Sequence, residues 1–438
     1  MPRVSALARR FRYAIAAIDQ IALSLFGFAL NLVLVRVLSA TDFGIVSLWL
    51  SVSLLAIGIQ NALVNGPLSV YLPATRNPGA ARALETALNL VNLATVALSA
   101  AGVAVVNWAS DAEWARHDLA TGLAIPLFIA FTLLREYYRS VAYSRHDMAT
   151  LLWTDLPYLA TTTLCLVAML VWPTRFGTLA GAFLALTLGC ATSQVFQQRR
   201  RAEPNPPLFR RGALKPYRAI MGEVSWSLVG VFANHVETRS YTYIATSMIG
   251  LVALAAINIV GVLFRPITVL SSAWAKPALP QLSRLLAHRE IAAFNRMVAW
   301  ALGATTVGSI LWYLALLACW QPVEHFVLAD KYPEAKALLL PWAAASAAST
   351  LRYVAGLGLI AARQFKFLAH VQIVCGAAAA AATVAMILWQ GLVGAMWGIA
   401  IGNAACLAMI LMRLRHVHRP EFLTAHPAWD ASPENSEG

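Results

Sequence analysis

The chain has 438 residues, a formal net charge of +13 and a hydrophobic fraction of 59%, while only 12% of its residues are charged. This composition excludes an ordinary soluble enzyme, because there is too little polar sequence to cover a water-exposed surface of this size. The positive charge does not require a nucleic-acid partner, since the bias of Lys and Arg toward one side of a membrane accounts for it.

Long apolar segments fill the sequence. A helix needs about 20 mostly apolar residues to cross about 30 Å of hydrocarbon. We predict an all-α membrane protein with twelve spanning helices, over residues 13–37, 43–73, 83–107, 119–141, 151–172, 176–197, 222–248, 251–275, 297–320, 335–362, 367–389 and 392–412. The first apolar run is too long for the core of a cleavable signal, so we predict that it is the first span.

Lys and Arg are concentrated in alternate junctions between these segments. Most of the 33 basic residues lie before the first span, in the even-numbered junctions or in the tail. The odd-numbered junctions contain only Arg116, Arg175, Lys331 and Lys336. Because loops rich in Lys and Arg stay in the cytoplasm, we predict that both termini are cytoplasmic. A wrong number of helices would have mixed the two sets of junctions.

A polar stretch in the middle of the chain divides the spans into two sets of six. We predict an N-terminal lobe over 1–198, a basic cytoplasmic linker over 199–218 and a C-terminal lobe over 219–412. Two such halves are related by an axis along the membrane normal and enclose a central cavity. We interpret the linker as contacting anionic lipids at the cytoplasmic face, not nucleic acid. The polar tail 413–438 is predicted to be disordered.

The sequence lacks the patterns of a catalytic or metal-binding protein. Its five cysteines lie in apolar segments without paired spacing, which predicts buried packing residues and no disulfide or metal site. No HExxH, GxSxG, Walker or GxGxxG motif occurs. The outer loops near 108–118 and 321–334 are too short to form a catalytic domain. We therefore expect no enzyme activity, metal or cofactor, and we leave a coupling proton or sodium ion as an open alternative.

Three stretches resemble one family of transporters. LVRVLSATDFGIVSLWLSVSLL at 34–55 is similar to the opening of polysaccharide-biosynthesis flippases of the Wzx type, with Arg36, a short polar turn and an aromatic-glycine pair. ADKYPEAKALLLPWAAASAA at 329–348 resembles that family's lead into its tenth helix. PALPQLSRLLA at 277–287 resembles the end of its seventh-to-eighth helix hairpin. The family belongs to the multidrug/oligosaccharidyl-lipid/polysaccharide exporter superfamily.

The resemblance implies a fold and an activity. The fold has twelve helices in two lobes. The activity is the flipping of an oligosaccharide on a polyprenyl-diphosphate carrier, such as an exopolysaccharide or O-antigen repeat unit, across a bacterial inner membrane, with other polysaccharide-assembly proteins as partners. The seventh helix departs from many relatives, which carry an aspartate where this chain reads NHVETRSY with Glu237 and Arg239. No role of that aspartate is therefore carried over to this chain.

Five arginines lie within predicted spans, where a charge at the bilayer centre costs about 2.5–3.5 kcal/mol and therefore faces a partner or a cavity. They are Arg36, Arg135, Arg239, Arg265 and Arg352. Because guanidinium groups bind phosphate oxygens in a two-pronged manner, all five are candidate ligands of a diphosphate. We expect Arg265 to face the cavity, since it lies near mid-span and precedes the helix-bending Pro266. The alternative is a buried ion pair with a carboxylate such as Glu237.

Ion pairing is also an alternative for other arginines in this set. Arg135 and Arg352 each either bind the diphosphate or form an ion pair. The acids available for such a pair are Asp19 and Asp155. Arg36 lies one turn from the outer end of its span, so a helix-end anchor or a salt bridge to a loop acid is favoured there over cargo binding.

Other residues within the spans suggest coupling and hinge roles. The candidates for a coupling-ion site or a salt bridge are Asp19, Asp155, His235 and Glu237. A hydrogen-bonded packing role is favoured for the histidine over proton transfer. The candidate hinges are Pro67, Pro266 and Pro341.

Three other functions compete with a flippase. A cation-coupled multidrug antiporter of the same superfamily is the main alternative, although acidic cavities suit cationic drugs and the buried arginines here roughly balance the acids. A membrane polymerase or ligase acting on lipid-linked sugars would need a larger outer loop. A non-transporting component of a polysaccharide-export complex remains open.

Overall fold

The computed structural model describes residues 22–75, 77–110, 118–145, 147–200, 214–362 and 364–417. Over these ranges the chain is almost entirely helical and contains no β-strand. Asp19, most of the predicted linker and most of the predicted tail lie outside the described residues.

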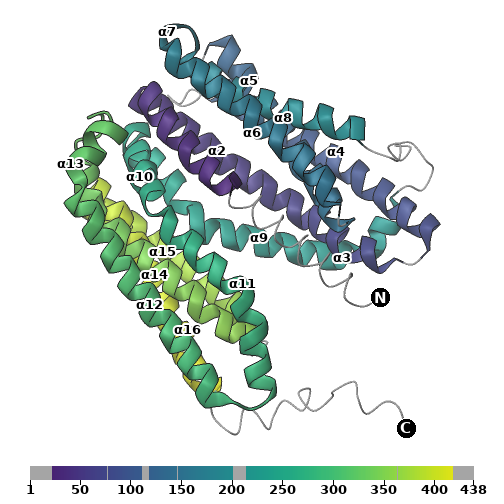
Figure 1. Ribbon diagram of the computed structural model, residues 1–438, viewed down its shortest axis with the longest axis vertical. Helices are drawn as coiled ribbons and strands as arrows, with labels where there is room; N and C mark the ends of the chain where they lie inside the picture. Colours follow the sequence, from purple (N-terminus) through teal and green to yellow (C-terminus); the bar gives the residue numbers. More distant parts are fainter. Residues whose placement is uncertain are drawn as a thin grey trace. The chain divides into compact units, whose positions relative to one another are not determined.

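Figure 1 shows the helices of the described residues in sequence colours. In chain order they are Ala22–Val37, α2 (Ala40–Gln60), η1 (Asn61–Asn65), α3 (Gly66–Ala74), α4 (Pro78–Ala109), α5 (Leu119–Ser144), α6 (Met148–Val171), α7 (Pro173–Phe176), α8 (Leu179–Arg200), α9 (Lys215–Met248), α10 (Leu251–Leu263), α11 (Arg265–Ala287), α12 (Ile291–Ala318), α13 (Trp320–Pro322), η3 (Val323–Val327), α14 (Ala335–Ala361), α15 (Phe365–Gln390) and α16 (Leu392–Val417).

These helices agree with the predicted all-α, multi-pass membrane fold. Nine described helices are long and apolar enough to cross a membrane, and α10 with α11 adds a tenth if this bent pair is one span. The first predicted span corresponds to Ala22–Val37, which begins at the edge of the described residues. The seventh corresponds to α9, which has 34 residues but a more polar composition. With these two helices, the described part of the chain is roughly consistent with the twelve predicted spans, of which nine or ten have the length and composition of a span.

Contacts divide the chain into two compact units, Met1–Phe232 (unit 1) and Ala233–Gly438 (unit 2). The boundary lies within α9, whereas the sequence suggested the linker over 199–218. The beginning of α9 belongs with unit 1 because Tyr217 and Val224 pack into an apolar cluster formed by η1, α3, α4 and α5.

In unit 1, the second span changes its helical geometry ahead of a proline. Pro67 has no N–H and cannot donate a hydrogen bond to the Leu63 carbonyl one turn earlier. Residues Asn61–Asn65 form a π-helical turn at this point. The Tyr217 hydroxyl donates to the Leu63 carbonyl at 3.1 Å, which satisfies the acceptor that the proline leaves free.

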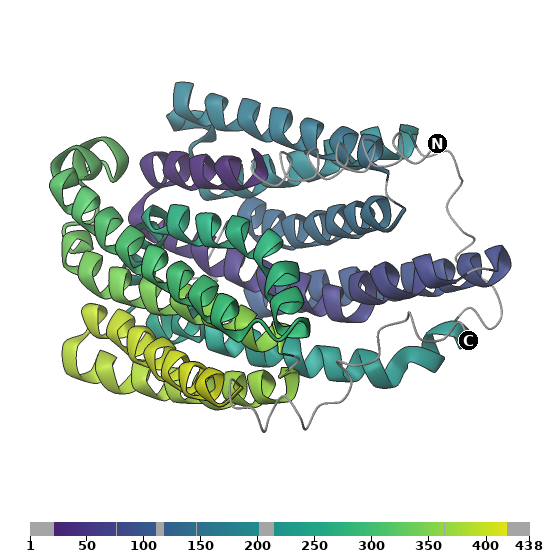
Figure 2. The ribbon, with the colours of Figure 1, turned by 60° about the horizontal axis from the view of Figure 1, so that its bottom comes forward.

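In unit 2, α14 packs against α11, α12 and α16, and α15 runs along α16 (Figure 2). Phe294 and Leu359 are fully buried where α12 and α14 meet, and Leu282 of α11 and Ile410 of α16 join them in one apolar cluster. This packing fixes α11, α14 and α16 as the walls of the site described below.

The eighth span bends by 46° between α10 and α11. Pro266 is at the start of α11 and cannot donate a backbone hydrogen bond into the preceding turn. The carbonyl of Leu263 in that turn accepts a hydrogen bond from the Trp312 indole at 2.9 Å. Of the other candidate hinges, Pro67 follows the π-helical turn and Pro341 lies inside the continuous helix α14. Movement about these three prolines remains a prediction.

Candidate functional site

Unit 2 contains a cavity of about 440 Å³ walled by α9, α10, α11, α14 and α16. Its volume lies within the range of about 300–1,000 Å³ that is usual for small-molecule sites. Its uncharged polar side chains include Thr238, Asn258, Thr268, Ser346, Ser349 and Asn403. These hydroxyl and amide groups can donate and accept hydrogen bonds, so the cavity suits a polar ligand.

Three of the five arginines predicted from the sequence line this cavity. Arg239 comes from α9, Arg265 is the first residue of α11 at the bend, and Arg352 comes from α14. Glu237 also lines it, although it is only two residues from Arg239 on the same helix. The structure therefore brings together charges from three helices that the sequence could place only within separate spans.

Glu237 forms an ion pair with Arg352 through Nη1 of the guanidinium. The Glu237 side chain is 4% exposed and the Arg352 side chain 18% exposed. Arg352 Nη1 also lies 3.7 Å from the Cys406 sulfur. Gly376 of α15 packs against Glu237, and a Cβ there would lie 3.2 Å from the Glu237 Cβ. Gly376 thus packs against the backbone and Cβ of Glu237, and Arg352 compensates the carboxylate. The alternative pair of Glu237 with Arg265 does not form.

Arg239 and Arg265 differ from Arg352 in their surroundings. No carboxylate within the described ranges forms an ion pair with either of them. Arg265 is exposed and Arg239 is partly exposed, and the two guanidinium groups are close enough to repel one another. Positive charge that is not neutralised by the protein and faces a cavity attracts an anionic ligand.

Trp342 forms part of the cavity wall and packs against α10 through two contacts. Its indole N–H donates to the Ile257 carbonyl of α10 at 2.7 Å. The ring also covers Gly261, where a Cβ would lie 2.6 Å from Trp342 Cζ2. Glycine is therefore needed at this position for α10 to approach α14 so closely.

Gly261→Ala is expected to displace Trp342 and lower the free energy of unfolding by about 1–3 kcal/mol, the usual cost of overpacking. Thermal denaturation of the purified protein measures this change. Gly303→Ala in α12 is the matched control, because its Cβ would meet no atom within 4 Å and alanine has the higher helix propensity. A shift of the same sign and size in both variants would contradict the packing described for Trp342.

The other predicted site residues lie outside this cavity. His235 Nε2 lies 2.8 Å from the Tyr243 hydroxyl, in agreement with a hydrogen-bonded packing histidine. Arg36 is exposed near the end of its helix. Within the described ranges, no group of three His, Cys, Asp or Glu side chains is placed to hold a metal ion.

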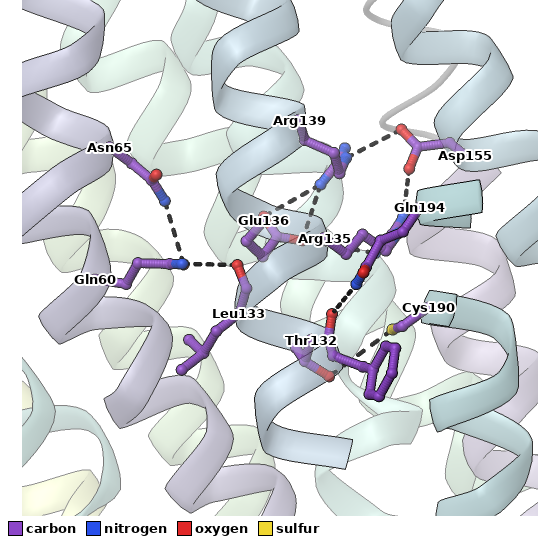
Figure 3. A network of polar contacts seen from close by, with 11 residues as sticks. Gln60, Asn65, Thr132, Leu133, Arg135, Glu136, Arg139, Asp155, Cys190 and Gln194 are labelled. Atoms are coloured by element: carbon purple, nitrogen blue, oxygen red, sulfur yellow. Dashed lines mark hydrogen bonds and ion pairs between the residues drawn. The ribbon is translucent and has the colours of Figure 1, made fainter. Parts of the chain in front are cut away.

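Arg135 belongs to a buried ion-pair network in unit 1 (Figure 3). It pairs with Asp155, whose other oxygen accepts a hydrogen bond from Arg139 Nε at 3.0 Å. Arg139 also pairs with Glu136 at 3.2 Å. The Arg135 guanidinium stacks over the Tyr158 ring at 3.8 Å. Of the two alternatives for Arg135, the structure shows the ion pair with Asp155, and these contacts join α5 to α6.

The uncharged polar lining of the cavity was not predicted as a site. Ser346, Ser349 and Arg352 are spaced three residues apart on α14 and therefore share one face of that helix. Small polar residues at helical spacing beside an arginine within a span are the signal that identifies this face. Asn258 and Asn403 lie on other helices and have no comparable local signal.

Comparisons with known proteins identify the fold. No protein-family profile and no curated protein matches the sequence. The inward-facing structure of a multidrug resistance MATE family transporter of the MOP superfamily aligns with a TM-score of 0.70 and 11% identity, over 93% of this chain and 99% of that one. The inward closed structure of the lipid II flippase MurJ aligns with a TM-score of 0.72 and 12% identity, over 91% of this chain and 87% of that one. A third match, MATE in complex with MaL6, has a TM-score of 0.59 and 11% identity, over 93% of this chain and 94% of that one. The protein therefore has the fold of the MATE transporters and of MurJ.

Proposed function

We propose that the protein is a flippase that moves a polyprenyl-diphosphate-linked oligosaccharide from the inner to the outer leaflet of a bacterial inner membrane by alternating access. The observation that carries this proposal is the cavity in unit 2, where three guanidinium groups face one carboxylate. In a protein with this many membrane-length helices, such a cavity suits an anionic cargo group. The cargo's diphosphate is that group.

The chemistry of the lining fits the two polar parts of such a cargo. Arg239 and Arg265 offer planar donors that match phosphate oxygens. The hydroxyl and amide side chains of the same cavity suit the hydroxyl groups of a sugar. The polyprenyl chain stays in the bilayer, so only the polar head needs to enter the protein.

The membrane potential favours the proposed direction of transport. The cytoplasm is negative, so the outward movement of an anion releases about 2.3 kcal/mol of free energy per charge per 100 mV. A coupling proton or sodium ion would change this sum, and Asp19 and Glu237 stay candidates for such coupling. Other polysaccharide-assembly proteins and anionic lipids at the cytoplasmic face are proposed partners.

A cation-coupled multidrug antiporter is the second candidate function. The fold does not distinguish the two, since the matching structures include multidrug transporters and a lipid II flippase. The charge of the cavity favours the flippase, because two of its arginines lack a described carboxylate partner and would repel a cationic drug.

Transport by the purified protein in proteoliposomes tests the proposal. A fluorescent polyprenyl-diphosphate oligosaccharide is placed in one leaflet, and a membrane-impermeant quencher reads its appearance in the other. We expect protein-dependent flipping of this lipid and no proton-driven efflux of a cationic dye. Dye efflux without lipid flipping would establish the antiporter. Transport of neither would favour a non-transporting component of an export complex.

A further inference from the structure

The charged groups that line the cavity have a defined sum. They are Arg239, Arg265, Arg352 and Glu237, and the remaining described lining residues are uncharged at neutral pH. The three guanidinium groups and one carboxylate leave two positive charges in excess. This sum counts Glu237 as a carboxylate, because its side chain is 4% exposed and forms an ion pair with Arg352.

Glu237 contributes its negative charge to the cavity from a buried position in the wall. Arg352 compensates it on one side, and neither Glu237 oxygen accepts a hydrogen bond from another group among the described residues. Gly376 of α15 packs against the backbone and Cβ of Glu237. Arg239 and Arg265 are therefore the charged groups that contact a ligand directly. The Glu237–Arg352 pair affects the ligand through the net charge of the cavity.

The charge of a lipid-linked diphosphate depends on whether one or both of its phosphates are esterified. A diphosphate that is esterified at both ends carries two negative charges. A diphosphate with a free terminal phosphate carries about three above pH 7, because a terminal phosphate loses its second proton near pH 6. A ligand charge that the site does not neutralise must be removed from water without a partner, which is costly.

We propose that Glu237 is a specificity-determining residue that matches the cavity to a doubly esterified diphosphate, with two charges, and against a terminal diphosphate, with three. This inference rests on the proposed function and names its substrate class more closely. The first ligand is a carrier lipid with a sugar attached. The second is the carrier that remains after a glycan-transfer reaction has removed the sugar. The cavity thus selects loaded carrier over spent carrier.

Binding of two soluble probes to the full-length protein in nanodiscs tests this selectivity at pH 8. The probes are P1,P2-dimethyl diphosphate and methyl diphosphate, and the measured quantity is the ratio of their dissociation constants. We expect the wild-type protein to bind the dimethyl ester more tightly. Glu237→Gln leaves three excess charges, so we expect the ratio to shift toward methyl diphosphate by about tenfold, which corresponds to about 1.4 kcal/mol.

A charge-conserving double variant separates charge from shape. Glu237→Gln combined with Arg352→Gln removes one charge of each sign and again leaves two excess charges, so the wild-type preference should return. Glu290→Gln removes an exposed carboxylate at the start of α12, and it should leave the ratio unchanged. Each variant is compared with wild type by thermal denaturation.

The outcomes distinguish this inference from the proposed function. If the wild-type protein binds neither probe, the anion-binding cavity itself is refuted. If it binds both but Glu237→Gln leaves the ratio unchanged, or the double variant shifts as much as the single one, only the role of Glu237 is overturned.

Discussion

Asp155→Ala is expected to lower the free energy of unfolding by about 3–5 kcal/mol, because removing one partner of a buried ion pair leaves an uncompensated charge. Asp155 is 1% exposed and binds both Arg135 and Arg139. Arg135 is itself 6% exposed and cannot reach water without disturbing the packing of α5 against α6. Thermal or chemical denaturation of the purified protein measures the loss.

The control for this variant is a carboxylate on the same helix that faces solvent. Asp147 is exposed, and it caps the N-terminus of α6 through a 3.0 Å hydrogen bond from the Thr150 amide. Asp147→Ala should cost about 1 kcal/mol, the usual value of an N-cap. Equal losses from the two variants would show that the network around Asp155 contributes no more than a surface cap.

Arg265→Gln and Arg239→Gln are each expected to slow flipping of the lipid-linked oligosaccharide by about ten- to a hundredfold. A hydrogen bond to a charged group contributes about 1.5–3 kcal/mol, and about 1.4 kcal/mol corresponds to a factor of ten. Neither arginine has a described carboxylate partner, so its removal leaves no buried acid unpaired. The loss should therefore appear in transport and not in stability.

The matched control is Arg284→Gln, an exposed arginine in the last turn of the same helix as Arg265. It should transport at the wild-type rate in proteoliposomes. Arg352→Ala is a poorer test, because it leaves Glu237 buried without its partner and so affects folding as well. If Arg265→Gln and Arg284→Gln transported equally fast, the cavity arginines would have no part in binding the cargo.

The helical fold could be predicted because its signals are local and strong. Apolar length and the alternation of Lys and Arg between junctions identified the spans. The breaks were harder to place, since their form depends on distant groups. Pro266 suggested a bend, but the Trp312 side chain that satisfies the Leu263 carbonyl is 49 residues away in sequence. The boundary between the units lies within α9 and not in the predicted linker, because Tyr217 packs into unit 1.

The candidate site could be predicted only in part. Charge within a span identified Arg239, Arg265 and Arg352, and the structure brings these three to one cavity. The sequence does not show which acid pairs with which arginine, because pairs such as Glu237 with Arg352 join separate helices. Arg135 carries the same signal as Arg265 but belongs to a separate network with Asp155. Tertiary packing, not residue type, separates the two cases.

The central claim is that an anionic group of the cargo binds in the cavity of unit 2. Protection of a single cysteine tests it most directly, in a protein whose five native cysteines are replaced. Ser349→Cys places a thiol in the cavity lining, and Ala292→Cys places one at an exposed position on α12. The account predicts that P1,P2-dimethyl diphosphate slows maleimide labelling at position 349 and leaves labelling at position 292 unchanged. Equal labelling of position 349 with and without this anion, at concentrations up to those that inhibit flipping, would contradict it.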